Sequence, residues 1–233
     1  MPDNSPKVIF SLPTETSDNP NYSYWVDGQL HREDGPATVF TGASGESKAW
    51  YTHGEKHRVD GPAVEEPNGH KEYWVNGEKH RNPADGPAVT KADGTQEYWV
   101  NGQMHKKDGP AVIVPGVRKE YWIDGQLHRD NDLPAIEYES GEKHWYQAGK
   151  HHRQAAPSIE RENGGQNWHT NGKLHREDGP AVTSADGSEA WYQHGQVHRE
   201  NGPAVITADG TEEYWLEGVR YEDEDEWAAA LKS

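Results

Sequence analysis

Aromatic residues recur along this chain at a regular spacing, and each pair of rings is followed by polar, turn-forming residues. In Tyr73–Ala88, YWVNGEKHRNPADGPA, two large rings and a valine precede Asn76-Gly77, and a His-Arg pair follows it. An Asn-Gly pair between aromatic or β-branched residues is the strongest short signal for a β-hairpin, because a type I′ turn needs positive φ at both turn residues. The pattern therefore predicts hairpins.

The same pattern repeats along the chain, with steps of 23 to 26 residues between anchoring glycines. These glycines are Gly28, Gly54, Gly77, Gly102, Gly125, Gly149, Gly172, Gly195 and Gly218. After each hairpin, Asp-Gly-Pro predicts a second reversal, and a short strand such as Ala204–Thr207 leads to another turn at Asp209-Gly210. We predict an all-β fold, an elongated antiparallel β-meander of about nine 23-residue hairpin repeats with two strands and two turns each.

A two-residue turn also fixes which side chains share a face. It predicts Val75 opposite Glu78, Trp74 opposite Lys79, and Tyr73 opposite His80. In the first eight repeats, the first ring then lies on the same face as a histidine, and in the ninth Tyr214 faces Tyr221. Cross-strand pairs of this kind contribute about 0.2–1 kcal/mol each. The predicted structural ladder comprises His31, His57, His80, His105, His128, His152, His175 and His198.

The second ring of each repeat is predicted to lie on the opposite, more hydrated face. Where this ring is tryptophan and follows tyrosine, we take it as a candidate binding residue for a sugar or a basic protein. These residues are Trp25, Trp74, Trp99, Trp122 and Trp215. Packing within the sheet is the competing interpretation of each of them.

The composition strengthens the case for an unusual interior. Leu, Ile, Val and Phe total 30 of 233 residues, and the net charge is −17, a combination typical of disordered chains. Ten tryptophans and 11 tyrosines argue against disorder. We therefore expect stacked rings to replace an aliphatic core.

Charge and motifs limit the classes of function. Forty acidic against 23 basic residues disfavour direct binding of nucleic acid or anionic membranes and favour a protein partner with a basic surface. The chain has no cysteine, no apolar run of membrane-spanning length and no secretory pattern in residues 1–21, so a cytoplasmic location is expected.

Histidine followed by Arg or Lys recurs with a nearby acid, as in His31 with Asp34 and His175 with Asp178. A histidine oriented by a carboxylate is a general base, but an enzyme needs one such site rather than eight. Histidines on successive hairpins lie roughly 10 Å apart, too far to share a metal. We predict no catalytic residue, no metal and no cofactor. The pairs His151-His152 and His53/His57 are local clusters of low weight.

The two ends differ from the repeats. Residues 1–21 are predicted to form an arm, in which Val8–Leu12 could add an edge strand. Residues 22–221 form the repeat domain, and residues 222–233 are predicted to form an acidic helical cap. Its Trp227 and Leu231, four residues apart, are expected to sit on the last hairpin.

The units resemble MORN-type repeats, and more closely the HRxDGPA variant of open reading frames in tailed phages and large DNA viruses. They are also similar to YwqK-type antitoxin repeats. The resemblance covers about residues 22–221 and implies a scaffold or binding surface. The third repeat has an insertion at Asn82-Pro83, the fifth reads DLPA, and the sixth reads QAAPS.

The function predicted from these observations is a non-catalytic, protein-binding scaffold with an acidic, aromatic-rich surface. The resemblance is consistent with a phage or viral inhibitor of a host defence protein acting in the host cytoplasm. One alternative is an acidic mimic of nucleic acid that occupies a DNA-binding protein. Another is a binder or enzyme for a small ligand, a sugar or nucleotide, at one irregular repeat, which predicts one deep pocket. The oligomeric state stays open.

Overall fold

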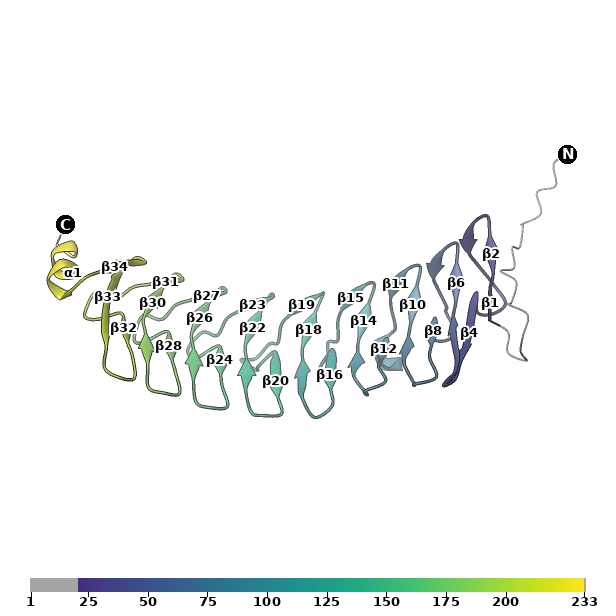
Figure 1. Cartoon of the computed structure of the whole chain (residues 1–233), viewed down its shortest axis with the longest axis horizontal. Coiled ribbons are helices and arrows are strands. Elements are labelled where there is room, and N and C mark those ends of the chain that lie inside the picture. The colour runs from purple at the N-terminus through teal and green to yellow at the C-terminus, as the bar shows by residue number, and fades with distance from the viewer. Residues whose placement is uncertain (1–20, 233) are drawn as a thin grey trace. The chain divides into compact units, whose positions relative to one another are not determined.

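The fold is described from a computed structural model, which places residues 21–232. These residues form two compact units, residues 21–115 (unit 1) and 116–232 (unit 2). Each unit is an antiparallel meander of short strands with hairpins (Figure 1), so the predicted all-β hairpin meander is confirmed. The predicted arm, with its edge strand at Val8–Leu12, lies outside the described residues apart from Asn21.

In unit 1, consecutive meander strands pair antiparallel in chain order. They are β1 (Tyr22–Ser23), β4 (Thr38–Gly42), β5 (Gly45–Ala49), β8 (Val64–Glu65), β9 (Lys71–Glu72), β12 (Val89–Thr90), β13 (Gln96–Glu97) and β16 (Val112–Val114). The hairpins are β2 (Trp25–Val26) with β3 (Gln29–Leu30), β6 (Tyr51–Thr52) with β7 (Glu55–Lys56), β10 (Trp74–Val75) with β11 (Glu78–Lys79), and β14 (Trp99–Val100) with β15 (Gln103–Met104). The insertion in the third repeat forms a 3₁₀ turn, η1 (Pro83–Asp85).

Unit 2 has the same plan. Its meander strands are β17 (Arg118–Glu120), β20 (Ile136–Tyr138), β21 (Lys143–His144), β24 (Ile159–Glu160), β25 (Gln166–Asn167), β28 (Val182–Thr183), β29 (Glu189–Ala190), β32 (Val205–Ile206), β33 (Glu212–Leu216) and β34 (Val219–Tyr221). The hairpins are β18 (Trp122–Ile123) with β19 (Gln126–Leu127), β22 (Tyr146–Gln147) with β23 (Lys150–His151), β26 (His169–Thr170) with β27 (Lys173–Leu174), and β30 (Tyr192–Gln193) with β31 (Gln196–Val197).

A regular repeat contains four short strands, not the two that we predicted. In the third repeat, the predicted continuous strand is divided at Tyr73 into β9 and β10. The Tyr73 N–H donates to the carbonyl oxygen of Ala88 at 2.7 Å, while its own carbonyl accepts the His80 N–H at 3.1 Å. The chain therefore changes its pairing partner at the first ring, which separates the meander strand from the hairpin strand.

The predicted hairpin register is confirmed, with Trp74 opposite Lys79 and Val75 opposite Glu78. Asn76 and Gly77 have φ of 50° and 74°, as a type I′ turn requires. The same left-handed backbone occurs at Ala148 and Glu217, with φ of 46° and 48°, although these residue types do not favour it. The turn geometry is therefore kept even where the local sequence signal is lost.

The most deeply buried position of the repeat is the alanine of DGPA, which the sequence analysis missed. The fully buried alanines, with 0% exposure, are Ala37, Ala63, Ala88, Ala111, Ala135, Ala181 and Ala204. In the sixth repeat the equivalent residue is Ser158, also at 0%. The recurrence of a small residue after proline was the available signal, since close-packed elements leave room only for a methyl group.

The C-terminal helix α1 (Glu224–Ala230) confirms the predicted cap. Asp223 is its N-cap and accepts a hydrogen bond from the Glu226 N–H at 2.9 Å. Trp227 is buried, with its ring 5.3 Å from that of Tyr214 in β33. Leu231 is 40% exposed because it lies beyond the last helical turn, so the expected packing holds for Trp227 but not for Leu231.

Candidate interaction surface

The first ring of each of the first eight repeats is covered by a cation from the same repeat, whereas that of the ninth, Tyr214, packs on Trp227. The Arg58 guanidinium lies 3.9 Å from the Trp50 ring centroid, and the Lys106 ammonium lies 3.6 Å from that of Tyr98. A cation on an aromatic face contributes about 0.5–2 kcal/mol. The other pairs are Arg32 on Tyr24, Arg81 on Tyr73, Arg129 on Tyr121, Arg153 on Trp145, Arg176 on Trp168 and Arg199 on Trp191. The sequence predicted a ladder of rings, whereas the repeated contact is between a ring and a cation.

The ladder histidines connect consecutive hairpins. The Asn76 N–H donates to Nδ1 of His57 at 3.1 Å, so a histidine of one repeat holds the turn of the next. Within the two units, the same bond joins His31 to His53, His80 to Asn101, His128 to Ala148, His152 to Asn171, His175 to His194, and His198 to Glu217. The backbone N–H of His105 donates to the Tyr98 carbonyl oxygen at 3.1 Å. A ring nitrogen that accepts a backbone N–H is not protonated, which fixes the tautomer of each neutral ladder histidine.

The arginine also organises the loop that follows the hairpin. In the second repeat, Arg58 Nε lies 3.1 Å from Asp60 Oδ1, and its Nη1 donates to the Pro62 carbonyl at 3.1 Å. Arg32 with Asp34 and Arg176 with Asp178 repeat this arrangement. In the HRxDGPA loop, the arginine therefore packs against the ring and the proline carbonyl, while the acid side chains are exposed to solvent.

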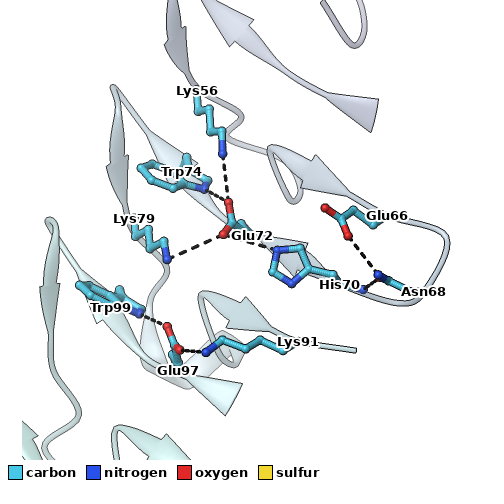
Figure 2. Close-up of polar contacts among 10 residues, drawn as sticks. All are labelled: Lys56, Glu66, Asn68, His70, Glu72, Trp74, Lys79, Lys91, Glu97 and Trp99. Carbon is cyan, nitrogen blue, oxygen red and sulfur yellow. Dashed lines mark hydrogen bonds and ion pairs between the residues drawn. The ribbon is translucent and has the colours of Figure 1, made fainter. Parts of the chain in front are cut away.

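Two second rings in unit 1, Trp74 and Trp99, are held by the largely buried carboxylates of Glu72 and Glu97 (Figure 2). Glu72 accepts the Trp74 indole N–H at 2.8 Å, and the ammonium groups of Lys56 and Lys79 lie 3.2 and 3.8 Å from it. Burial by itself raises the pKa of Glu72, but the indole and the two lysines outweigh it, so its pKa lies below the usual value. Glu97 is held in the same way by Lys91 at 2.7 Å and by Trp99.

The candidate binding tryptophans lie against lysines and carboxylates of the same unit. Lys56 and Lys79 lie 4.8 and 5.6 Å from the Trp74 ring centroid, and Lys79 lies 5.1 Å from that of Trp99. In unit 2, Trp122 and Trp215 donate their indole N–H groups to Glu120 and Glu213. Trp25 lies opposite Leu30 in the first hairpin. The geometry favours a packing role for the four hydrogen-bonded indoles, because internal partners satisfy their polar atoms.

The HRxDG loops form an exposed surface that carries acids. The sequence analysis considered these acids only as partners of the histidines. In unit 1, the side chains of Glu33, Asp34 and Asp60 are 87%, 83% and 86% exposed. In unit 2, those of Glu177 and Asp178 are 86% and 84% exposed. The arginines of the same loops are only 15–26% exposed. Negative charge therefore faces solvent in each unit. The repeated acid in HRxDG was the signal for this surface.

Hollows lie between neighbouring loops within each unit. In unit 1, a hollow of about 600 Å³ is lined by Glu33, Asp34, Trp50, His57 and Asp60 among others. In unit 2, hollows of about 330 and 510 Å³ flank the sixth loop. Each of them is partly open to solvent. Two of the three flank the irregular sixth repeat, and a small-ligand site at an irregular repeat stays a prediction.

A histidine cluster occupies the irregular sixth repeat. The His151 ring lies 5.5 Å from that of His144 and 5.0 Å from that of His169, and its buried Nδ1 has no hydrogen-bond partner in the described structure. His169 Nδ1 is 2.8 Å from the hydroxyl of Ser158. Burial, followed by the two neighbouring histidines, lowers the pKa of His151 to about 4. His151 is therefore neutral near pH 7 and becomes protonated only in acid.

Residues 21–232 contain no group of three or more His, Cys, Asp or Glu side chains arranged to hold a metal ion. No described helix is long and apolar enough to cross a membrane. A comparison of the chain with protein-family models and with curated protein sequences finds no match.

Proposed function

We propose that this protein is a non-catalytic scaffold that binds another protein through the exposed carboxylates of its HRxDG loops. The observation that carries the proposal is the segregation of charge within each loop. Arginine is turned onto a ring and a proline carbonyl, whereas the acids at the third and fourth motif positions project into solvent. Such a surface attracts a basic partner and speeds its encounter.

The spacing of the acids favours a protein partner over imitation of DNA. Repeats follow one another at roughly 10 Å, two strand spacings, and regular loops expose one or two acids each. Duplex DNA carries one charge per about 1.7 Å of its axis. The number of loop acids per unit length is therefore several-fold too low to imitate a phosphate backbone. The proposal places the protein in the cytoplasm.

The proposal predicts a partner that depends on loop acids and on ionic strength. Glu33→Gln, Glu177→Gln and Glu200→Gln together remove three exposed loop carboxylates that are not paired with the loop arginine. Glu162→Gln, in an exposed meander turn, is the matched control. In affinity capture from host lysate, we expect a protein retained by the wild type and the control, lost by the triple variant, and released by salt.

Two results would count against this function. Retention of the same proteins by all three baits would show that the loop acids do not mediate binding. Displacement of the partner by duplex DNA in a competition assay would favour the mimic instead.

A further inference from the structure

The eighth loop carries an asparagine where regular loops carry an aspartate. Its sequence is HRENGPA, against HREDGPA in the first and seventh repeats, and Asn201 is exposed to solvent. Arg199 Nε donates to Asn201 Oδ1 at 3.1 Å, just as Arg176 Nε lies 2.8 Å from Asp178 Oδ1. A neutral amide therefore occupies a place in which other loops hold a carboxylate.

Asn201 is also followed by glycine, and an Asn-Gly pair can react with itself. The backbone nitrogen of the glycine attacks the side-chain carbonyl carbon of the asparagine, and ammonia leaves as a cyclic succinimide forms. Water then opens the ring and yields either aspartate or isoaspartate. Glycine favours the reaction because it has no side chain to hinder the attack. Overall, one water is consumed and one ammonia is released, with no other reactant.

The chain has six Asn-Gly pairs, and in five of them the glycine N–H is held in a hydrogen bond. The acceptor is a backbone carbonyl, either of the preceding hairpin or three residues earlier in the same turn, at 2.9 to 3.0 Å. These glycines are Gly69, Gly77, Gly102, Gly164 and Gly172. The N–H of the sixth, Gly202, donates to no other residue among residues 116–232, the described part of unit 2. Its nitrogen is therefore the one that loses no hydrogen bond when it attacks.

The guanidinium of Arg199 lies against this pair. A Cβ built on Gly202 would lie 3.6 Å from Arg199 Cζ. The guanidinium is held there by the Trp191 ring, 3.8 Å away, and by the Pro203 carbonyl, which accepts from Nη1 at 2.8 Å. A cation that donates to a carbonyl oxygen stabilises the negative charge that develops on this oxygen during attack on the carbon.

We propose that Asn201-Gly202 is a self-modifying site. The Gly202 nitrogen attacks the Asn201 side chain, and Arg199 stabilises the charge on Oδ1. The aspartate product converts the eighth loop to HREDGPA and adds a carboxylate beside Glu200, whose side chain is 71% exposed. The site is independent of the proposed binding function.

The test compares Asn201 with Asn163 in the full wild-type chain. Both lie in the tripeptide Glu-Asn-Gly and both are exposed, so their intrinsic reactivities are matched. Asn163 differs in that its Oδ1 accepts the Gly165 N–H at 3.1 Å, and the N–H of Gly164 is bonded to the Arg161 carbonyl at 3.0 Å.

Conversion at each site is followed by peptide mass spectrometry during incubation at mildly alkaline pH. We expect Asn201 to convert roughly tenfold faster than Asn163, because its reaction breaks one backbone hydrogen bond fewer. In the chain unfolded in urea, the two sites should convert at the same rate.

Arg199→Lys tests the role of the arginine and keeps a cation for the ring, as Lys106 provides on Tyr98. We expect this variant to convert Asn201 roughly threefold more slowly or less, while Asn163 keeps its rate. An unchanged or faster conversion of Asn201 would overturn the role of Arg199.

Two results would overturn the site itself. Equal rates at Asn201 and Asn163 in the folded chain would show that the loop does not promote the reaction. Formation of aspartate without isoaspartate would show direct hydrolysis by water, because attack by the Gly202 nitrogen yields both products.

Discussion

Replacement of Ala88 by leucine is expected to lower the free energy of unfolding by about 3 kcal/mol or more. Ala88 is fully buried, and its carbonyl accepts the Tyr73 N–H at 2.7 Å, so the backbone cannot move away without losing this bond. Added methylene groups at such a site force strain on their surroundings, with costs of about 1–3 kcal/mol and sometimes more. Urea denaturation followed by tryptophan fluorescence measures the change.

The same repeat supplies the control for this substitution. Ala92 lies exposed in the meander turn between β12 and β13. Ala92→Leu should change the free energy of unfolding by less than about 0.5 kcal/mol. Equal effects of the two substitutions would show that Ala88 is not a close-packed position.

Acidification is expected to destabilise unit 2 before the carboxylates of the protein titrate. The pKa of His151 is about 4 in the folded protein and about 6.5 when unfolded. Because the unfolded state then binds more protons, stability is full above pH 6.5 and falls as pH decreases toward 4. At about 1.4 kcal/mol per pH unit, the upper bound for His151 alone is about 3 kcal/mol. Burial, then Arg161 and His144, lowers the pKa of His169 and adds to the effect.

A leucine at residue 151 tests this origin of the acid sensitivity. His151 pairs with Tyr146 across its hairpin. In two other hairpins the equivalent position holds leucine, Leu30 and Leu127. His151→Leu is therefore expected to flatten the dependence of the urea midpoint on pH between 7.5 and 5. His194→Asn, at an exposed turn where other repeats carry asparagine, should leave the dependence unchanged. An unaltered pH dependence in His151→Leu would exclude the cluster as its cause.

The hairpins were predictable because their signals are local. Asn76-Gly77 specifies both the turn and the register, and those in turn place Trp74 opposite Lys79. The acidic helix start was equally local, since Asp223 caps the helix that follows it. The break of the third repeat's strand at its first ring was not predictable, because it depends on a bond from Tyr73 to Ala88, which lies 15 residues away.

The roles of individual side chains were less accessible than the fold. The repeat period showed that His57 and Arg58 recur. It did not show that the arginine stacks on the Trp50 ring, or that the histidine accepts a hydrogen bond from the next hairpin turn. Both outcomes depend on the distance between consecutive repeats, which no single repeat encodes. The same reason explains Arg153, whose missing loop acid is replaced by Asp132 of the preceding repeat. Irregular repeats are understood only together with their neighbours.

We conclude that polar links between consecutive repeats replace an aliphatic core. Amide hydrogen exchange at the hairpin turns tests it most directly, because those turns face solvent and their N–H groups bond to a histidine of the preceding repeat. Asp27, in the first hairpin, has no preceding ladder histidine among residues 21–232 and serves as an internal reference.

We predict that, after correction for intrinsic rates, the amides of Asn76, Asn171 and Glu217 exchange at least tenfold more slowly than that of Asp27. Exchange of all four amides at the same unprotected rate would contradict the claim.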